Sequence, residues 1–582
     1  MSRNSHQTPA AVVLSCIAMV GCDRMPSAAA DTVPPRISDV SIEKNPNPTV
    51  PLAAILRLTT DEPARITLLI DDGQRSWSVT PSDELVTEHS VMVLGMRPGR
   101  SHSIVAAAAD TDGNTSESES LVFETEPLPE EILQPTVAVL KPDQTEPGVT
   151  LFNFNQRWGP DGGQLQNFGA LIIVDERGEI VWFYRADHRI NEFIRLRNGN
   201  IFYGSGQSGR LREIDMLGNV VQQWQATRLL DEIPEGVTPV DTDSFHHEEL
   251  ELPNGNFLAL SSEARLVEDF RTSETDPDAP RAPSTVIGDV VVEFSRDGTI
   301  QGRWHLLDLI DVNRIGYESL DGGFWERPYG DIAEAPIRDW AHANGIEYDP
   351  RDDSIIISSP VQDVLIKVDR KSGELVWLLG TPTHWVEPWS SRLLKPVGEL
   401  EWPYFQHGAS FTGDGTLVML DNGNYRASAF EPKMPVEDSY SRAVEYAIDE
   451  ETMEVSEVWH YGGPGDELFY SGFLGDVDWL PITGNLLVTD GTRVTDADGR
   501  PVRPEPPPGG PPGGMRGGPP GGPPGGMRGG PPGGPPGIKR WARIVEVTHT
   551  QPAEKVFELV FADEPPAGVA IYRAKHLASL YP

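Results

Sequence analysis

The chain has 582 residues, which is long enough for two domains with sizeable hydrophobic cores. It carries 88 acidic and 47 basic side chains, for a formal net charge of −41. A field of this sign repels nucleic acid and anionic membrane surfaces, so we expect neither as a partner. The only two cysteines, Cys16 and Cys22, lie near the N-terminus, which excludes an internal disulfide and a cysteine-ligated metal from the folded domains.

Residues 1–30 are typical of an export signal. Arg3 precedes an apolar run from Ala10 to Val20, and a small residue stands directly before Cys22. This pattern predicts bacterial lipoprotein processing with acylation of Cys22, and the alternative is an ordinary secretory signal that is cleaved a few residues later. In both cases we expect an exported protein of the periplasm or cell envelope. Membrane association would be through the lipid alone, since no later stretch reaches the roughly 18 apolar residues of a membrane span.

Residues 34–127 form a separate unit in the sequence. Short alternating apolar runs are separated by proline and glycine, which predicts a small β-sandwich of the fibronectin type III kind. Asp110, Asp112 and Asn114 have a spacing that is compatible with a calcium loop, but D-T-D-G-N is more often a plain turn. The segment P-L-P-E-E-I-L-Q-P that follows reads as a linker.

A hairpin pattern recurs six times between residues 136 and 582. In each copy, apolar residues alternate on both sides of a turn, and the copies end in Trp182, Trp224, Trp304, Trp377, Trp459 and Phe557. A second turn followed by an apolar run precedes the later copies. Two hairpins per repeat predict a four-stranded blade, so six repeats predict a closed six-bladed β-propeller behind the sandwich. The final segment, residues 568–582, is expected to complete the first blade.

Residues 501–537 consist almost wholly of proline, glycine, methionine and arginine, in copies of G-G-P-P-G-G-M-R-G-G. Such a composition cannot bury enough apolar surface to fold. We therefore expect a disordered loop between two strands of the last blade.

The segment from Gly204 to Gly209, G-S-G-Q-S-G, matches the dinucleotide-binding fingerprint. The residues that follow have the alternation of a strand and not the periodicity of a helix, so no helix N-terminus would meet a phosphate. We expect no nucleotide site at this segment.

Four histidines, His246, His247, His342 and His407, stand at the start of predicted inner strands. His247 lies eight residues before the turn glycine of its repeat and His407 eight before Gly415, so the two have the same register. His342 fits this register if its turn is three residues longer. Because inner strands of a propeller line the central channel, we expect these side chains to converge on one axis.

The segment from Asp339 to Asp349, D-W-A-H-A-N-G-I-E-Y-D, with the following I-I-I-S-S and I-K-V-D-R-K-S-G-E-L-V-W, resembles bacterial arylsulfate sulfotransferases. The histidine pair and the segment Q-H-G-A-S-F-T-G-D-G-T-L-V-M-L-D-N-G-N from Gln406 are similar too, and the resemblance extends over the sandwich. It implies a six-bladed propeller that moves a sulfuryl group from an aryl sulfate donor to a phenolic acceptor. It also implies no cofactor and no nucleotide sulfate donor.

The resemblance assigns roles to individual residues. His407 matches the histidine that becomes transiently sulfated, His342 and Asn344 match its H-x-N partner motif, and His247 or His246 matches a further channel histidine. A neutral imidazole is a good nucleophile near pH 7, and a covalent intermediate divides sulfuryl transfer into two steps. Flanking hydrogen-bond donors would stabilise the charge on the sulfuryl oxygens.

The sequence departs from the family where an arginine usually follows the Ser-Ser pair, because Pro360 stands there. A guanidinium suits a tetrahedral oxyanion, so we expect Arg426 or Arg314 to take its place. Trp340 and Tyr404 are candidates for a wall against the phenol ring.

Glu248 and Glu249 follow the histidine pair. We expect one of these carboxylates to face solvent and the other to pair with a cation in the channel.

Two other functions stay open. Converging histidines with Glu248, Glu249 or Asp476 are also a ligand set for a divalent metal ion, as in other propeller enzymes. Alternatively, the chain is a lipid-anchored binding propeller without turnover. The sequence leaves the oligomeric state open, with a homodimer as one option.

Overall fold

A computed structural model describes residues 31–156, 168–204, 209–230, 232–502, 538–561 and 568–581. The predicted lipid attachment at Cys22 and nearly all of the proline- and glycine-rich segment 501–537 lie outside these residues. Within the described ranges, every helix is too short or too polar to cross a membrane. The fold is all-β, as predicted.

The N-terminal unit is a β-sandwich that is built around one long strand. Its strands are β1 (Ile37–Lys44), β2 (Ala54–Asp71), β3 (Ser76–Val79), β4 (Val86–Val93), β5 (Ser101–Ala109), β6 (Thr115–Glu117) and β7 (Leu121–Glu124). The first half of β2 pairs with β1 and β4, and the second half pairs with β3 and β5. Pro63, which has no backbone N–H to donate, stands between the halves. Alternate side chains of β2, such as Leu58 and Ile66, are buried in the sandwich core.

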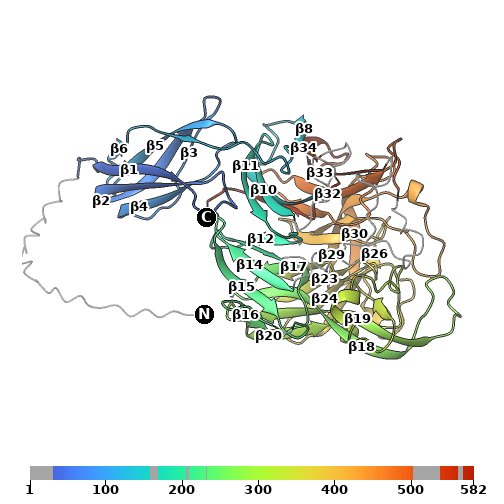
Figure 1. The fold of residues 1–582 in the computed structure, drawn as a ribbon. Helices are drawn as coiled ribbons and strands as arrows, with labels where there is room; N and C mark the ends of the chain where they lie inside the picture. Colours follow the sequence, from blue (N-terminus) through green and yellow to red (C-terminus); the bar gives the residue numbers. More distant parts are fainter. Residues whose placement is uncertain are drawn as a thin grey trace, which may run out of the picture.

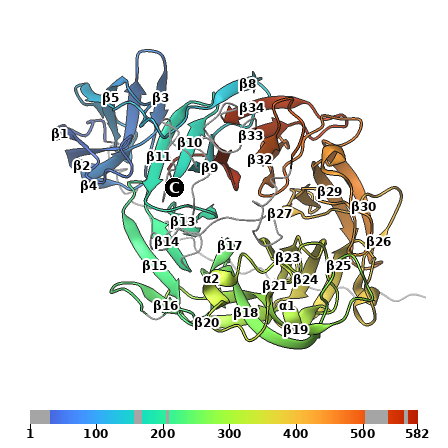
Figure 2. The same ribbon diagram turned by 45° about the vertical axis from the view of Figure 1, so that its right-hand side comes forward.

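Six further sheets follow in the described chain, and Figure 2 shows them arranged as blades around a centre. Blade 1 contains β9 (Val149–Gln156), β10 (Gly169–Asp175), β11 (Ile180–Ala186), β35 (Val569–Ala570) and β36 (Ala574–Leu577). Blade 2 contains β12 (Phe193–Arg195), β13 (Ile201–Gly204), β14 (Arg210–Ile214), β15 (Val220–Ala226) and β16 (Thr238–Val240). Blade 3 contains β17 (His246–Glu251), β18 (Phe257–Phe270), β19 (Ala282–Phe294), β20 (Ile300–His305) and β21 (Ile337–Asp339).

Blade 4 contains β22 (Gly345–Asp349), β23 (Ser354–Ser359), β24 (Val364–Asp369) and β25 (Leu375–Gly380). Blade 5 contains β26 (Lys395–Pro396), β27 (His407–Phe411), β28 (Leu417–Asp421), β29 (Arg442–Asp449) and β30 (Glu454–Tyr461). Blade 6 contains β31 (Asp476–Trp479), β32 (Leu486–Thr495), β33 (Lys539–Val547), β34 (Lys555–Phe561) and β8 (Thr136–Leu140). Two short helices, α1 (Leu306–Leu309) and α2 (Glu326–Tyr329), lie in the connection from blade 3 to blade 4, and the 3-10 turns η2 (Trp389–Arg392) and η3 (Val436–Asp438) lie further on.

Both ends of the propeller chain close the ring. β36 and β35 pair with β9 as the innermost part of blade 1, so the predicted completion of this blade by the C-terminal segment is confirmed. β8, from the start of the propeller chain, pairs with β34 at the outer edge of blade 6. The first and last blades therefore each contain strands from distant parts of the sequence, which leaves the ring without a free seam.

The tryptophans that end the repeats join neighbouring blades. Each indole N–H of four of them donates a hydrogen bond to the hairpin turn of the next blade, at Trp182 to Met216, Trp224 to Arg296, Trp377 to Glu450 and Trp459 to Thr550. Their rings are buried between the sheets. The repeated aromatic residue therefore packs neighbouring blades together.

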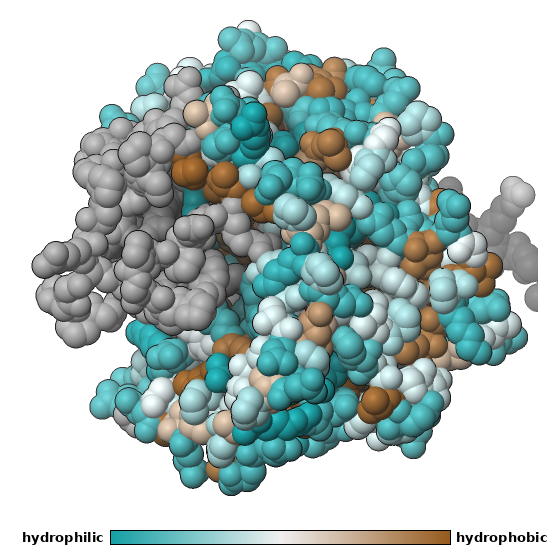
Figure 3. Space-filling view, turned by 90° about the vertical axis from the view of Figure 1, so that its right-hand side faces the viewer, coloured by the Kyte–Doolittle hydropathy of each residue, from teal (hydrophilic) through white to brown (hydrophobic). Residues whose placement is uncertain are grey.

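The sandwich packs against blade 1 (Figure 1) through partly buried ion pairs. Arg75 lies 2.5 Å from Asp175, Arg97 pairs with Glu179, and Tyr581 accepts a hydrogen bond from the backbone of Leu94 at 2.8 Å. The face in Figure 3 is mostly hydrophilic, with hydrophobic residues in small separate patches.

Candidate active site in the propeller channel

The candidate histidines stand where inner strands begin, at one end of the channel. β17 starts at His246 and β27 starts at His407, and the two residues pair with equivalent positions, Leu260 and Leu420, of the next strand. A β-bulge interrupts both ladders directly after these pairs. In β17 two bulged residues face none on β18, whereas in β27 two bulged residues face one on β28. The ladder therefore aligns His246, and not His247, with His407. The bulge of β17 moves His247 out of the ladder and toward the axis.

The backbone around these histidines is held in unusual conformations. His247 and His342 have left-handed backbones, with φ of 57° and 49°. Gly408, which follows His407, has φ of 59°, and a Cβ atom at this position would lie 2.0 Å from Oδ1 of Asp476. Such conformations cost free energy and persist only where the surrounding structure imposes them. The surrounding structure therefore holds the backbone at the histidine end of the channel in one defined conformation.

The structure brings the imidazoles together. The ring of His247 lies 4.7 Å from that of His342, and His246 lies 5.0 Å from His247, each between ring centroids. Tyr572 lies between His247 and His407, at 6.2 Å and 6.4 Å. Residues that are more than 300 positions apart in sequence thus share one end of the channel.

Hydrogen bonds determine the tautomer of His407. Its Nδ1 lies 2.8 Å from Oδ1 of Asn422 and 3.2 Å from the carbonyl oxygen of Phe405, and both partners only accept hydrogen bonds. The Asn422 amide is oriented because its Nδ2 donates to the carbonyls of Ser471 and Leu474. Nδ1 therefore carries the hydrogen, and Nε2 has the lone pair of a nucleophile.

A second chain of hydrogen bonds orients the histidine pair. Nε2–H of His246 donates to the carbonyl oxygen of Ser261 at 2.9 Å, which leaves Nδ1 as an acceptor. Nδ1 of His247 lies 2.8 Å from it and donates. The second nitrogen of His247, Nε2, therefore has a lone pair.

His342 differs from the other channel histidines because it has an ionic partner. Its Nδ1 lies 2.6 Å from Oδ2 of Asp339, and the other oxygen of Asp339 accepts the indole N–H of Trp325 at 2.9 Å. Burial opposes protonation of His342, but the charge and hydrogen bond of Asp339 raise its pKa to about 9. His342 is thus an imidazolium at neutral pH, with Nε2–H available as a donor.

The other three channel histidines, His246, His247 and His407, stay neutral. Burial lowers the pKa of His407 and that of His246 to about 4, and it holds the pKa of His247 well below its ordinary value, with the charge of His342 acting in the same direction. The neutral ring of His247 therefore lies 4.7 Å from the imidazolium of His342 between ring centroids, and Tyr572 links these rings to that of His407. Groups whose pKa values are moved in opposite directions are typical of acid–base sites.

Arg573 fills the channel beneath the histidines. It directly precedes β36, and its guanidinium reaches Glu192 of blade 2 at 2.9 Å, Glu248 of blade 3, and Asp476 of blade 6 at 3.9 Å. Lys575 lies one layer further down, 2.7 Å from Asp476 and 2.6 Å from Asp478. These ion pairs connect the inner strands of several blades.

Glu248 and Glu249 are both buried, with 8% and 2% of their surface exposed, so the expectation that one faces solvent is wrong. The bulge in β17 turns Glu248 toward Arg573, which confirms the expected channel cation. Burial raises the pKa of Glu249 to about 8.

The comparisons with known proteins follow the same division of the chain. A family model described as "Arylsulfotransferase (ASST)" matches residues 136–573, and a second, "Arylsulfotransferase Ig-like domain", matches residues 41–126. The first match alone covers well over half of the chain. The protein belongs to the arylsulfotransferase family.

Two curated relatives carry the name arylsulfate sulfotransferase AssT. The Escherichia coli O6:H1 (strain CFT073) protein is 30% identical over 357 residues, which is 53% of this chain and 55% of the relative. The Lelliottia amnigena protein is 28% identical over 374 residues, 55% of this chain and 58% of the relative. The chain thus spans about half the length of the curated relatives that it matches. A solved virginiamycin B lyase from Staphylococcus aureus is similar over 75% of this chain and 95% of its own, but a TM-score of 0.28 and 10% identity carry no argument.

We expected Arg426 or Arg314 to replace the arginine that is usual in the arylsulfotransferase family. In the described structure, neither guanidinium reaches the histidines. The guanidinium of Arg426 lies 2.7 Å from Glu401 and 3.0 Å from Asp421. That of Arg314 donates to Gln362 at 2.6 Å and lies over the ring of Trp385. Among the described residues, Arg573 lies in the channel instead, where its guanidinium pairs with Glu192 and Glu248 and donates to the carbonyl oxygen of Asn344 at 3.4 Å.

The other predicted site residues have mixed positions. Asn344 is fully buried and its Nδ2 donates to the carbonyl oxygen of Gln406 at 2.9 Å, so it braces the backbone next to His407. Trp340 is fully buried in the core between blades, with its indole N–H bonded to the carbonyl oxygen of Arg314. Tyr404 is half-buried, and its backbone N–H donates to Asp421.

Several residues next to the histidines escaped the sequence reasoning. Phe324 lies 5.5 Å from His247 and 5.1 Å from His342 between ring centroids, and it comes from the long connection between blades 3 and 4. Asn422 and Asp339 orient His407 and His342. Asp339 was detectable, because it lies three residues before His342 within the matched motif, whereas the loop position of Phe324 left no periodic signal.

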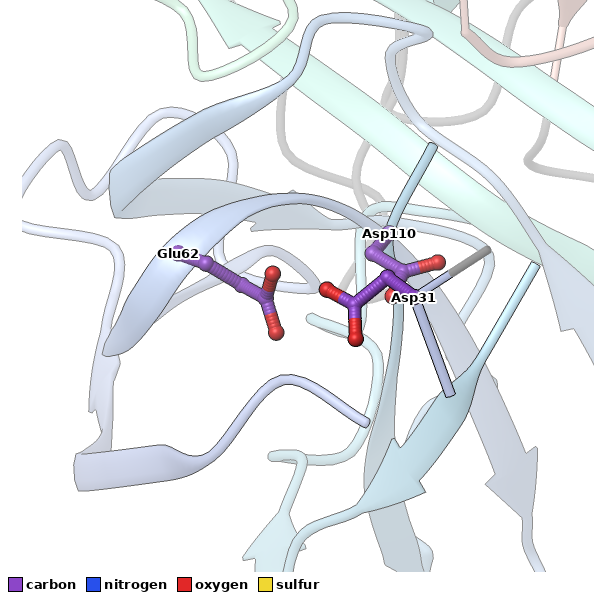
Figure 4. A group of neighbouring side chains, drawn as sticks. All are labelled: Asp31, Glu62 and Asp110. Atoms are coloured by element: carbon purple, nitrogen blue, oxygen red, sulfur yellow. The ribbon is translucent and has the colours of Figure 1, made fainter. Parts of the chain in front are cut away.

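Two groups of three carboxylates in the described chain could hold a metal ion, and neither contains a histidine. Asp31, Glu62 and Asp110 lie on the surface of the sandwich (Figure 4), and Asp110 caps its own turn through the backbone N–H of Asp112. The second group, Asp349, Asp352 and Glu450, surrounds the ammonium of Lys367. The arrangement of the described donor atoms therefore does not favour the hypothesis of a histidine-bound metal.

Proposed function

We propose that the protein moves a sulfuryl group from an aryl sulfate ester to a phenolic acceptor through a covalent sulfohistidine at His407, without a nucleotide sulfate donor. One observation carries the proposal most directly. Nδ1 of His407 is bonded to two acceptors, so Nε2 is a nucleophile, and the imidazolium of His342 belongs to the same cluster of rings. Membership of the arylsulfotransferase family supports the substrate class.

In the first step, Nε2 of His407 attacks the sulfur atom, the N–S bond forms, and the bond between sulfur and the aryl oxygen breaks. The leaving oxygen takes the proton from Nε2 of His342, so the product leaves as a neutral phenol. Positive charge develops on the His407 ring, and the hydrogen bonds from Nδ1–H to Asn422 and Phe405 stabilise it.

In the second step, the acceptor phenol gives its proton back to His342 as its oxygen attacks sulfur. The N–S bond breaks and His407 regains its lone pair. The lone pair on Nε2 of His247, 4.7 Å from His342 between ring centroids, is a second acceptor for the proton of the incoming phenol during this step. The cycle consumes no proton overall, which matches a site that contains one acid and one nucleophile.

The covalent step can be tested directly. The full chain is incubated with 4-nitrophenyl sulfate and no nucleotide, and we expect release of nitrophenol and about 80 Da of added mass on His407, the mass of a sulfuryl group. His407→Ala should abolish both signals. His460→Ala is a matched control, because His460 lies on β30 at the outside of blade 5 and should leave both signals intact. If the full chain is tested with several aryl sulfates and no histidine gains the mass of a sulfuryl group, the result would favour a binding propeller without turnover.

We also propose that the protein is exported and attached to a membrane through a lipid on Cys22. The apolar segment before Cys22 and the small residue next to it support this. Cells that express the full chain should incorporate labelled fatty acid into it, and Cys22→Ser should remove the label and move the protein to the soluble envelope fraction. A label that persists in the variant would contradict the proposal.

A further inference from the structure

The cavity beside His342 is too small for a substrate. It has room for about one water molecule, which is too little for an aryl ring. Its lining consists of Glu318, Asp321, Phe324, Asp339, His342 and Val361. Glu318 and Asp321 already accept hydrogen bonds, from the hydroxyl of Tyr425 and the backbone N–H of Gly323. Since His342 has only 6% of its surface exposed, a phenol can give its proton to this residue only after a covering group has moved.

Phe324 is a group that covers His342. Its ring lies 5.1 Å from that of His342 and 5.5 Å from that of His247, between ring centroids. Phe324 is half-buried, whereas His342 is buried, so the phenylalanine ring lies on the solvent side of the imidazole. A phenylalanine side chain makes no hydrogen bond that its movement would break. The cover over His342 is therefore an apolar ring that only packing holds in place.

Phe324 stands at the tip of a tight turn. The backbone N–H of Trp325 donates to the carbonyl oxygen of Gly322 at 3.0 Å, which closes the turn. A Cβ atom on Gly322 would lie 2.3 Å from the carbonyl oxygen of Ile337, so only glycine lets the chain pass this close to β21. Gly323, the residue before Phe324, is exposed. The ring of Phe324 thus has a neighbour without a side chain and can change its rotamer toward solvent.

Both ends of this turn are fixed on Asp339. On one side, the backbone N–H of Asp339 donates to the carbonyl oxygen of Asp321 at 3.0 Å. On the other side, the indole N–H of Trp325 donates to Oδ1 of Asp339 at 2.9 Å. The second oxygen of Asp339 holds His342. The backbone of the turn is therefore anchored on the partner of the acid, and the part that can move is the side chain of Phe324.

Water competes with a phenol for the sulfuryl group of the proposed sulfohistidine. The water oxygen can attack the sulfur atom as a phenol oxygen does: the new S–O bond forms, the N–S bond breaks, one proton passes to His342, and hydrogen sulfate leaves. Water is far more concentrated than any phenol. A transferase must therefore keep bulk water away from its intermediate.

We propose that Phe324 is a movable cover that makes phenols, and not water, the acceptors of the sulfuryl group. The ring turns aside when an aryl group enters, and the aryl group then takes its place against the imidazoles. Without an aryl group, the ring lies over His342 and His247 and excludes bulk water. The inference rests on the proposed sulfuryl transfer and names a residue that decides its acceptor.

The test measures how the sulfuryl group divides between water and a phenol. The full chain receives 4-nitrophenyl sulfate as donor and 4-ethylphenol as acceptor, and inorganic sulfate and 4-ethylphenyl sulfate are quantified. In Phe324→Ala, we expect the ratio of sulfate to aryl product to rise about tenfold or more, because bulk water reaches the imidazoles. Phe324→Leu should give a smaller rise, since its side chain still covers part of the two rings.

Phe430→Ala is the matched control. Phe430 is also half-buried and also packs against a histidine, His384, at 5.5 Å between ring centroids. His384 lies in the connection from blade 4 to blade 5 and not at the start of an inner strand. The control should therefore divide the sulfuryl group between water and 4-ethylphenol as the parent does.

The outcomes separate the role of Phe324 from the proposed function. An unchanged ratio in folded Phe324→Ala would overturn the cover and leave the sulfuryl transfer standing, and Phe324→Leu decides if the alanine variant does not fold. An equal rise in Phe430→Ala would assign the effect to general loosening and overturn the cover as well. If the parent forms sulfohistidine and neither Phe324 variant does, Phe324 serves the chemistry and is not a cover. A parent chain that forms no sulfohistidine would count against the proposed function itself.

Discussion

Asp339 and His342 form a buried ion pair, with Oδ2 of the carboxylate 2.6 Å from Nδ1 of the imidazole. The pair lies three residues apart in one turn of chain, and its carboxylate is also bonded to Trp325. Its effect is to place a charged acid next to neutral histidines: the pKa of His342 is raised to about 9, whereas burial lowers that of His407 to about 4.

The first prediction concerns the pH profile of the first half-reaction. The nucleophile must be neutral and the acid protonated, so sulfation of His407 should be active above the pKa of His407 and below that of His342. We expect kcat/KM for 4-nitrophenyl sulfate to form a broad plateau between about pH 4 and about pH 9. An alkaline limb near pH 6.5 would mean that His342 is not the ionised acid.

The acid limb needs a control for folding. His246 and His407 are neutral when folded, so below their ordinary pKa of 6.5 the unfolded chain binds more protons than the folded one. The contribution of these two histidines to stability is therefore fully present above pH 6.5 and falls as the pH drops toward 4. Circular dichroism at each pH separates this loss of folded protein from protonation of the nucleophile.

The second prediction is that Asp339→Asn moves the alkaline limb to lower pH. Asp339 is the main cause that raises the pKa of His342, and burial, the largest opposing cause, then acts against only the charges of Asp289 and Glu318. The pKa of His342 should therefore fall, and activity at pH 8 should drop about tenfold or more. The loss should be larger with phenyl sulfate than with 4-nitrophenyl sulfate, because a poorer leaving group depends more on proton donation. Asp331→Asn, at an exposed position of the same connection, should behave like the parent. Equal losses with the two donors would contradict the acid role.

The third prediction concerns Asn422 and the tautomer of His407. Asn422→Ala removes an acceptor for Nδ1–H, so part of the population should carry its hydrogen on Nε2 and the sulfation rate should fall about tenfold. Asn422→Asp keeps an acceptor but adds a negative charge, which raises the pKa of His407 and should move the acid limb to higher pH. Pre-steady-state sulfation measured between pH 4 and pH 7 distinguishes the two effects. An unchanged rate in Asn422→Ala would show that the carbonyl of Phe405 alone is sufficient.

The fourth prediction is that Arg573→Met destabilises the whole propeller. Removal of the guanidinium leaves Glu192 and Glu248 buried without their cation. Removing one partner of a buried ion pair lowers the free energy of unfolding by about 3–5 kcal/mol. The second substitution Glu248→Gln removes one of the orphaned charges, so the double variant should be more stable than Arg573→Met alone. Denaturant unfolding of the four proteins gives the coupling energy. Additive losses would indicate that the guanidinium acts by packing and not by charge.

The sequence by itself determined the fold class, because alternation of side chains along a strand and the turn between two strands are local properties. The six aromatic repeat ends, the all-β architecture and the completion of blade 1 by the last residues follow from such patterns. The register of the histidines could also be read, but only to within one residue, because a bulge has no sequence signature. The bulge at His247 and Glu248 shifted the alignment from His247 to His246.

Only the tertiary structure decided which side chains meet across the channel. Arg573 and Glu248 are 325 residues apart, and nothing near either residue in sequence specifies the other. The same holds for Tyr572 between His247 and His407, and for the commitment of Arg426 to Glu401. Contacts of this kind depend on how six sheets close into a ring, and ring closure is a property of the whole chain and not of any local pattern.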